Sequence, residues 1–207
     1  MTTYASCRIL LALSVLTCGL LSAQVVPIPV DQVVYEFVGQ FNNTSTTSQQ
    51  FGYISAVKGL SPIFTSDTTQ NETTALLTFV TNATTDRVIV NGPLRILNRT
   101  GTTTLYLNTP PSDFNDPSTF SQGTPVQVSH YTQQVIFNTV TNSIYTVHTN
   151  TIRQTVPFSL NGKTYQLGRV GAAFRTNYSG QVNTTSTVPS GWFAGHAVGV
   201  RARWDWD

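Results

Sequence analysis

Cysteine and lysine are the residue types that this chain most clearly lacks. The only cysteines are Cys7 and Cys18, and the only lysines are Lys58 and Lys163. Because both cysteines fall in a short apolar segment at the N-terminus, the rest of the chain can form no disulfide, cysteine–zinc site or catalytic thiol. The scarcity of lysine, together with few glutamates, excludes a long helical bundle.

Charge is scarce as well, since Asp, Glu, Lys and Arg make up only 10% of the residues. A quarter is typical of soluble domains. The 11 basic residues barely exceed the 9 acidic ones, which excludes the clustered cations of a nucleic-acid-binding protein. An aromatic content of 11% with so little net charge excludes a disordered chain. What remains is a neutral globular protein rich in Thr, Asn, Ser and Gln.

The first 23 residues have the pattern of a secretory signal peptide. Arg8 precedes the largely apolar, uncharged residues 9–21, and the small residues Ser22 and Ala23 follow. The apolar run is too short for a transmembrane helix. We therefore expect cleavage after Ala23 and a secreted, periplasmic or extracellular location. The lack of cysteine in the rest of the chain favours a bacterial source.

Residues 24–207 are expected to form a single all-β domain, because the chain alternates with a period of two and lacks helical periodicity. Many of these segments are apolar on both faces, so both faces must be covered. Two long segments suit tilted barrel strands. We predict an antiparallel β-barrel of about eight to ten strands, with a β-sandwich as the alternative. The predicted strands are 33–41, 51–57, 75–81, 87–90, 94–97, 103–107, 125–138, 143–156, 158–160, 164–167, 170–175 and 192–204.

Two Asn-Gly pairs are candidate hairpin turns. Asn161-Gly162 suits a type I′ turn, which would place Leu160 opposite Lys163 and Phe158 opposite Tyr165. Asn91-Gly92 is the weaker signal, because the following Pro93 has no N–H for a strand ladder.

Motifs with a known catalytic or nucleotide-binding mechanism are absent from the sequence. There is no P-loop, dinucleotide-binding glycine motif, zinc-protease motif or nucleophile elbow. The glycines of segment 195–199 alternate within a strand pattern, so close backbone approach explains them better than phosphate binding. No cofactor is expected.

Candidate chemistry rests on a few titratable side chains. Glu36 lies between Tyr35 and Phe37 and is a candidate base. His130 and His148 lie in the two long strands. A three-residue loop between these strands would place both histidines on one inner face, whereas a four-residue loop would separate them. The hydrophobic pattern favours the first register. Oxygen ligands for Ca²⁺ could come from Asp113, Asn115 and Asp116, although turn chemistry explains these residues equally well.

The composition favours a binding or structural role without catalytic machinery. The alternatives are a barrel that carries a small apolar ligand, and an isomerase- or hydrolase-type enzyme that uses Glu36 or a histidine as base. Partners are expected to be a small apolar ligand or an extracellular surface, with no nucleic acid and no transmembrane helix. A closed barrel is monomeric by default, although region 125–156 could leave a strand edge for pairing. Seven Asn-x-Ser/Thr triplets are either glycosylation sites or coincidences of an Asn- and Thr-rich chain; they begin at Asn42, Asn43, Asn71, Asn82, Asn98, Asn177 and Asn183.

Overall fold

The computed structural model describes residues 23–27, 29, 32–186 and 189–200. The predicted leader, apart from Ala23, and the C-terminal residues 201–207 lie outside the described residues. The described part of the chain contains eleven strands and one short 3₁₀ helix: β1 (Gln24–Val26), β2 (Val33–Asn43), β3 (Thr47–Val57), β4 (Leu77–Asn91), β5 (Leu94–Leu107), η1 (Pro117–Ser121), β6 (Thr124–Asn138), β7 (Ser143–Thr155), β8 (Phe158–Leu160), β9 (Lys163–Leu167), β10 (Ala173–Asn183) and β11 (Ser190–Gly199).

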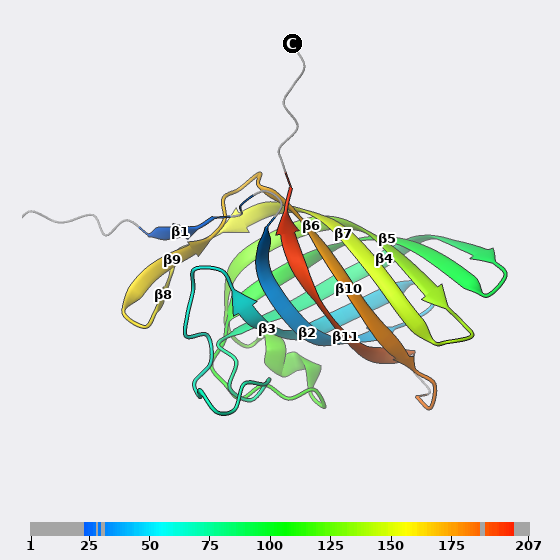
Figure 1. Cartoon of the computed structure of the whole chain (residues 1–207), viewed down its shortest axis with the longest axis horizontal. Helices are drawn as coiled ribbons and strands as arrows, with labels where there is room; N and C mark the ends of the chain where they lie inside the picture. The colour runs from blue at the N-terminus through cyan, green and yellow to red at the C-terminus, as the bar shows by residue number, and fades with distance from the viewer. Residues whose placement is uncertain (1–22, 28, 30–31, 187–188, 201–207) are drawn as a thin grey trace, which may run out of the picture.

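Eight of the strands close into an antiparallel barrel (Figure 1). Going around the barrel, the order is β2-β3-β4-β5-β6-β7-β10-β11, and β11 pairs with β2 to complete the ring. Each strand pairs with the next barrel strand along the chain, and the β8–β9 hairpin is inserted between β7 and β10. The predicted antiparallel barrel is therefore confirmed, with eight strands, and the sandwich alternative is wrong because the sheet closes.

A three-stranded sheet made by β1, β9 and β8 covers one end of the barrel. Asn161 and Gly162 have φ values of 52° and 74°, as a type I′ turn requires. Leu160 pairs with Lys163 and Phe158 with Tyr165, as the sequence predicts. Strand β1 adds to β9 in parallel. The side-chain Nε2 of Gln127 donates to the Leu167 carbonyl at 2.9 Å, which ties this sheet to the barrel.

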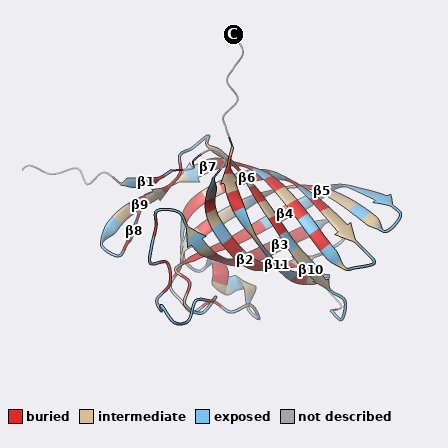
Figure 2. Ribbon diagram, in the orientation of Figure 1, coloured by how far each residue is buried: buried red, intermediate tan, exposed pale blue. Residues whose placement is uncertain are grey.

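The middle of the barrel is filled by aromatic side chains. The ring of Phe37 packs edge-on against Phe79 and Phe193, with centroid distances of 5.8 and 6.1 Å. Tyr178 stacks beside Phe193 at 4.6 Å. The cavity left among them is only about 30 Å³, about the share of liquid volume that one water molecule takes. In Figure 2 buried residues alternate with more exposed ones along the barrel strands, as expected where one face of each strand points inward.

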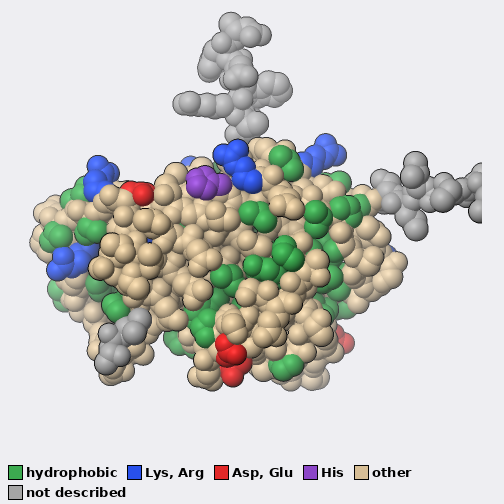
Figure 3. Space-filling model, turned by 180° about the vertical axis from the view of Figure 1, so that it is seen from behind, with side chains coloured by type: hydrophobic (Ala, Val, Ile, Leu, Met, Phe, Trp, Pro, Cys, Tyr) green, Lys and Arg blue, Asp and Glu red, His purple; other side chains and the backbone are tan. Residues whose placement is uncertain are grey.

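The face of the molecule that Figure 3 shows carries little charge, as the composition predicts. In Figure 3 the charged side chains are few and scattered, and hydrophobic side chains appear in small groups among neutral ones. The described residues include no helix of the length and apolar character that crossing a bilayer requires.

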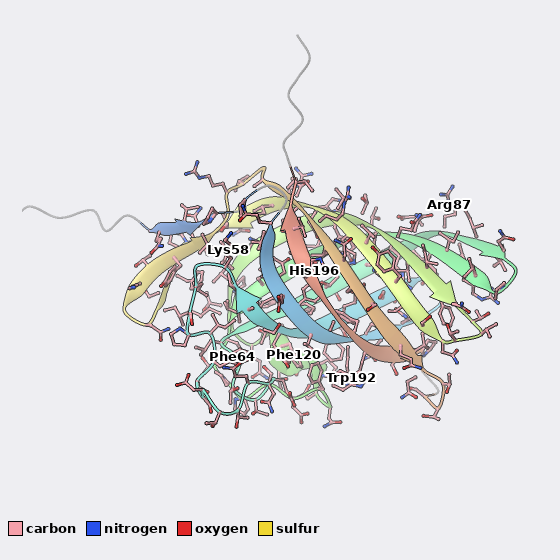
Figure 4. The ribbon with its side chains drawn as sticks, viewed as in Figure 1. Lys58, Phe64, Arg87, Phe120, Trp192 and His196 are labelled. Atoms are coloured by element: carbon pink, nitrogen blue, oxygen red, sulfur yellow. The ribbon has the colours of Figure 1, made fainter. Side chains whose placement is uncertain are left out.

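Two long loops, residues 58–76 and residues 108–123, cover the outer face of β3 and β4 (Figure 4). Phe120 of η1 packs on Phe51 of β3 at 5.4 Å and on Phe114 at 4.9 Å. The hydroxyl of Thr78 donates to the Phe120 carbonyl at 2.7 Å. These loops explain why β3 and β4 carry apolar residues on both faces.

Several predicted strands are longer in the structure. Strands β4 and β5 are continuous where the sequence predicts breaks, and β10 continues to Asn183, past the predicted strand end at residue 175. The β4–β5 turn consists of Gly92 and Pro93, because Asn91 pairs with Leu94, so the candidate pair Asn91-Gly92 is displaced by one residue. Gly92 has φ 57°, and the ring of Pro93 fixes the negative φ that the second position of a type II′ turn needs. An N–H at that position is not part of the strand ladder.

Candidate functional site

A cavity of about 170 Å³ lies at the end of the barrel away from the covering sheet. Strand β2 begins near the covered end, where Val34 faces Leu167 across a small apolar space, and reaches the cavity with Phe41 and Asn43. The part of the cavity wall nearer the open end of the barrel is apolar and comes from five strands. Its members are Phe41, Leu97, Val135, Phe137, Ile144 and Val182.

The floor of this cavity is polar and is organised around the hydroxyl of Tyr178. Nε2 of Gln133 donates to this hydroxyl at 2.8 Å, and the hydroxyl donates to Oε1 of Gln50 at 3.1 Å. Nε2 of His148 lies 3.3 Å from the same oxygen. Because the tyrosine proton is directed to Gln50, the geometry assigns His148 as the donor through Nε2–H. The ring of Tyr131 stacks on the imidazole at 4.4 Å.

Burial keeps these aromatic groups uncharged. Burial first, and then the nearby Arg99 guanidinium, lowers the pKa of His148 from 6.5 to about 3. Burial raises the pKa of Tyr178 to about 12 and also raises the pKa of Tyr131. The floor is therefore a network of neutral hydrogen-bonding groups at physiological pH.

Among the described residues, Arg99 is the one cation on the cavity wall, and the residue is only 6% exposed. Its Nε donates to the hydroxyl of Thr85 at 3.2 Å, and no carboxylate of the described residues lies within ion-pair distance. Burial lowers the pKa of Arg99, but a guanidinium stays protonated in proteins. Oδ1 of Asn43, on the same cavity wall, is buried and has no partner among the described residues. A buried cation without an anion is energetically unfavourable, so the cavity is suited to an anionic guest.

The structure separates the histidines that the sequence suggested as a pair. Asn138 pairs with Ser143 across a four-residue loop, so Gln133 faces His148 and His130 faces Thr151. The predicted three-residue register is wrong, and His130 is exposed on the outer face whereas His148 lies inside. The loop is set by polar contacts: Oδ1 of Asn138 accepts the N–H of Val140 at 3.0 Å. The hydrophobic pattern alone did not contain that information.

Glu36 is exposed on the outer face of β2, opposite His196 of β11. Of the titratable residues that the sequence suggests for a barrel site, only His148 lies in the interior. The assignment of Glu36 or a histidine as a base stays a prediction.

The carboxylates proposed as calcium ligands bind their own loop. Oδ1 of Asp113 accepts from the backbone N–H and the side-chain amide of Asn115, at 2.8 and 2.9 Å. Oδ1 of Asp116 accepts from the N–H and hydroxyl of Ser118, at 3.1 and 2.7 Å, and caps η1. The described residues contain no group of three His, Cys, Asp or Glu side chains placed to hold a metal ion. Calcium binding stays a prediction.

Sequence reasoning did not single out Arg99 or Tyr178. A signal for Arg99 exists, because it alternates in phase with Leu97 and Leu105, which face inward in β5. A charged residue at a strand position that faces the interior breaks the hydrophobic pattern, and such positions indicate functional sites.

Comparison with known proteins adds no family: no family model matches the chain, and no curated protein or solved structure gives a significant match.

Proposed function

We propose that the open end of the barrel binds a small apolar carboxylic acid, with the carboxylate on Arg99 and the hydrocarbon part against the apolar wall. The observation that carries this proposal is the buried Arg99, which has no acidic partner among the described residues and lies deeper in the barrel than a ring of aliphatic and aromatic side chains. A guanidinium and a carboxylate match in geometry and form two parallel hydrogen bonds. The proposal develops the ligand-carrier alternative of the sequence analysis.

The size of the cavity limits the ligand to a single ring or a short chain. An apolar cavity of about 150 Å³ holds one benzene molecule, and this cavity has about 170 Å³. Benzoate and hexanoate are therefore suitable probes. Benzyl alcohol has the ring of benzoate without its charge, so it isolates the contribution of Arg99.

Isothermal titration calorimetry of the wild type and Arg99→Met tests the proposal. We expect benzoate to bind the wild type, and Arg99→Met to weaken this binding about 30-fold or more, which corresponds to a charge-assisted hydrogen bond of about 2 kcal/mol. Benzyl alcohol should bind both proteins equally. Arg99→Met should keep its melting temperature, because it removes an unpaired buried charge.

Arg175→Met is the matched control, since it removes an exposed arginine of β10 and changes the net charge by the same amount. This control should bind benzoate like the wild type. If neither benzoate nor hexanoate binds the wild type, or if Arg99→Met binds benzoate as tightly as the wild type does, the proposal is wrong.

We also propose that the protein acts outside the cytoplasm, which the leader pattern of residues 1–23 supports. Expression of the full chain in a bacterium with an intact export pathway should give an exported product that begins at Gln24. Mass spectrometry of the purified product measures whether its mass is that of residues 24–207. An unprocessed chain in the cytoplasm would contradict the proposal.

A further inference from the structure

Strands β4 and β5 extend past the rim of the barrel as a projecting arm (Figure 1). The pairing of β3 with β4 ends at Thr47 and Thr84, and the N–H of Thr85 makes one further bond, to the Thr46 carbonyl at 2.7 Å. Beyond that point β4 pairs with β5 alone, as far as Asn91. Segment 86–91 is therefore a strand edge, and Arg87 marks its base in Figure 4.

The turn fixes which backbone groups point out of this edge. In a hairpin with a two-residue turn, the residues next to the turn exchange both backbone hydrogen bonds, and hydrogen-bonded pairs then alternate. Asn91–Leu94, Ile89–Ile96 and Arg87–Asn98 are such pairs in this register. The N–H and C=O groups of Val88 and Val90 must then point away from β5, toward the open edge.

The side chains of the edge are apolar and accessible. Val88, Ile89 and Val90 are 48%, 41% and 57% exposed. Natural edge strands are commonly protected by lysine, proline or inward charges, whereas here the only basic side chain, Arg87, hydrogen-bonds Asn98 within the arm at 3.1 and 3.3 Å. An accessible strand edge with three consecutive β-branched residues is suited to pairing with another strand.

We propose that this edge pairs in antiparallel fashion with the same edge of a second copy of the chain. A two-fold axis then passes between the two Ile89 residues. In this register Val88 faces Val90 of the second copy and Val90 faces its Val88, so four backbone hydrogen bonds form. Ile89 faces Ile89 on the opposite side of the sheet, and Arg87 faces Asn91, so no like charges oppose each other. Such a self-complementary contact is the symmetric arrangement expected of a homodimer.

Neighbouring registers of this pairing are less favourable, so the segment specifies a single register with its own second copy. A shift by two residues in one direction places Val90 opposite Asp86, and in the other direction it places Val88 opposite Gly92 in the turn. Either shift loses apolar cross-strand contacts. The default expectation of a monomer allowed a free edge in region 125–156. Strands β6 and β7 are instead paired on both sides, and a free edge lies on segment 86–91 of β4.

Sedimentation velocity of the exported chain, from about 1 to about 500 μM, tests the dimer. We expect a reversible monomer–dimer equilibrium, with a dissociation constant that Val90→Lys raises at least tenfold because it brings an unpaired charge onto a desolvated strand contact. Val140→Lys is the matched control, because Val140 is 76% exposed and lies in the β6–β7 loop. It should dimerise like the wild type.

The register has its own test in a chain that has no cysteine after residue 18. Ile89→Cys should form an intermolecular disulfide under mild oxidation, since the two residues face each other across the two-fold axis, and Val140→Cys should not. A monomer at every concentration, or a Val90→Lys protein that dimerises like the wild type, would overturn the proposal. Dimers of Ile89→Cys that fail to cross-link would assign the contact to another surface. Arg99→Met should dimerise normally, which separates this test from that of the ligand.

Discussion

Gly52→Ala is expected to be among the most destabilising single substitutions in the barrel. Gly52 of β3 lies opposite Gly39 of β2, and a Cβ on Gly52 would lie 2.1 Å from the Val38 carbonyl oxygen and 2.6 Å from the Cα of Gly39. Both contacts are with backbone atoms, so no side-chain rotation relieves them. The two glycines allow the strands to pass closely beneath the Phe79 ring, which would itself lie 3.0 Å from the new Cβ.

We expect Gly52→Ala to lower the free energy of unfolding by about 3–5 kcal/mol, at or above the usual cost of overpacking. Urea denaturation monitored by circular dichroism measures this change. Gly59→Ala is the control: a Cβ there meets nothing within 4 Å, and only the φ of +83° is unfavourable. Its cost should be about 1 kcal/mol. A Gly52→Ala protein that is as stable as Gly59→Ala would show that β2 and β3 are farther apart than the structure places them.

The fold was predictable because its signals are local. Period-two alternation with apolar residues on both faces requires covered strands, and Asn161-Gly162 determines its own turn and its own pairs. The β6–β7 register was not predictable in this way. Both faces of these strands mix apolar and polar residues, so a one-residue shift costs little in hydrophobic pattern, and the choice is made by Asn138 and its contacts in the loop.

The candidate site was less predictable than the fold, for a physical reason. The residues of the site come from four different strands and meet only because the sheet closes. They are Gln50 of β3, Arg99 of β5, Gln133 of β6 and Tyr178 of β10. No sequence spacing connects them. Likewise, the outer aromatic contacts of Phe51 with Phe114 and Phe120 depend on where a loop folds back, which strand periodicity does not determine.

His148 is expected to make the barrel strongly sensitive to acid. Its pKa is about 3 in the folded protein and about 6.5 in an unfolded chain. Between these values the unfolded chain binds a proton that the folded chain does not, so the free energy of unfolding falls as the pH falls. The slope approaches about 1.4 kcal/mol per pH unit, and the total loss is at most about 4–5 kcal/mol. Above about pH 6.5 this group contributes no pH dependence.

The charged and titratable groups around the imidazole do not offset this effect. Tyr131 and Tyr178 stay neutral throughout the range because burial raises the pKa of both, and Arg99 stays charged. No carboxylate of the described residues lies within ion-pair distance of the imidazole to stabilise its protonated form. Protonation would therefore place a second cation beside the Arg99 guanidinium in a desolvated interior.

Urea denaturation of His148→Gln and the wild type between about pH 3.5 and 7.5 measures the contribution of His148. The glutamine amide can still donate to the Tyr178 hydroxyl, but it does not titrate. We expect His148→Gln to be less stable than the wild type at pH 7, because it loses the stacking contact with Tyr131. The difference should shrink and then reverse as the pH falls, because only the wild type loses stability through this group. His130→Gln removes an exposed histidine from β6 and should follow the wild-type curve. Parallel curves for His148→Gln and the wild type would mean that the imidazole binds its proton equally well in the folded barrel and in the unfolded chain, and the expected acid sensitivity would then be wrong.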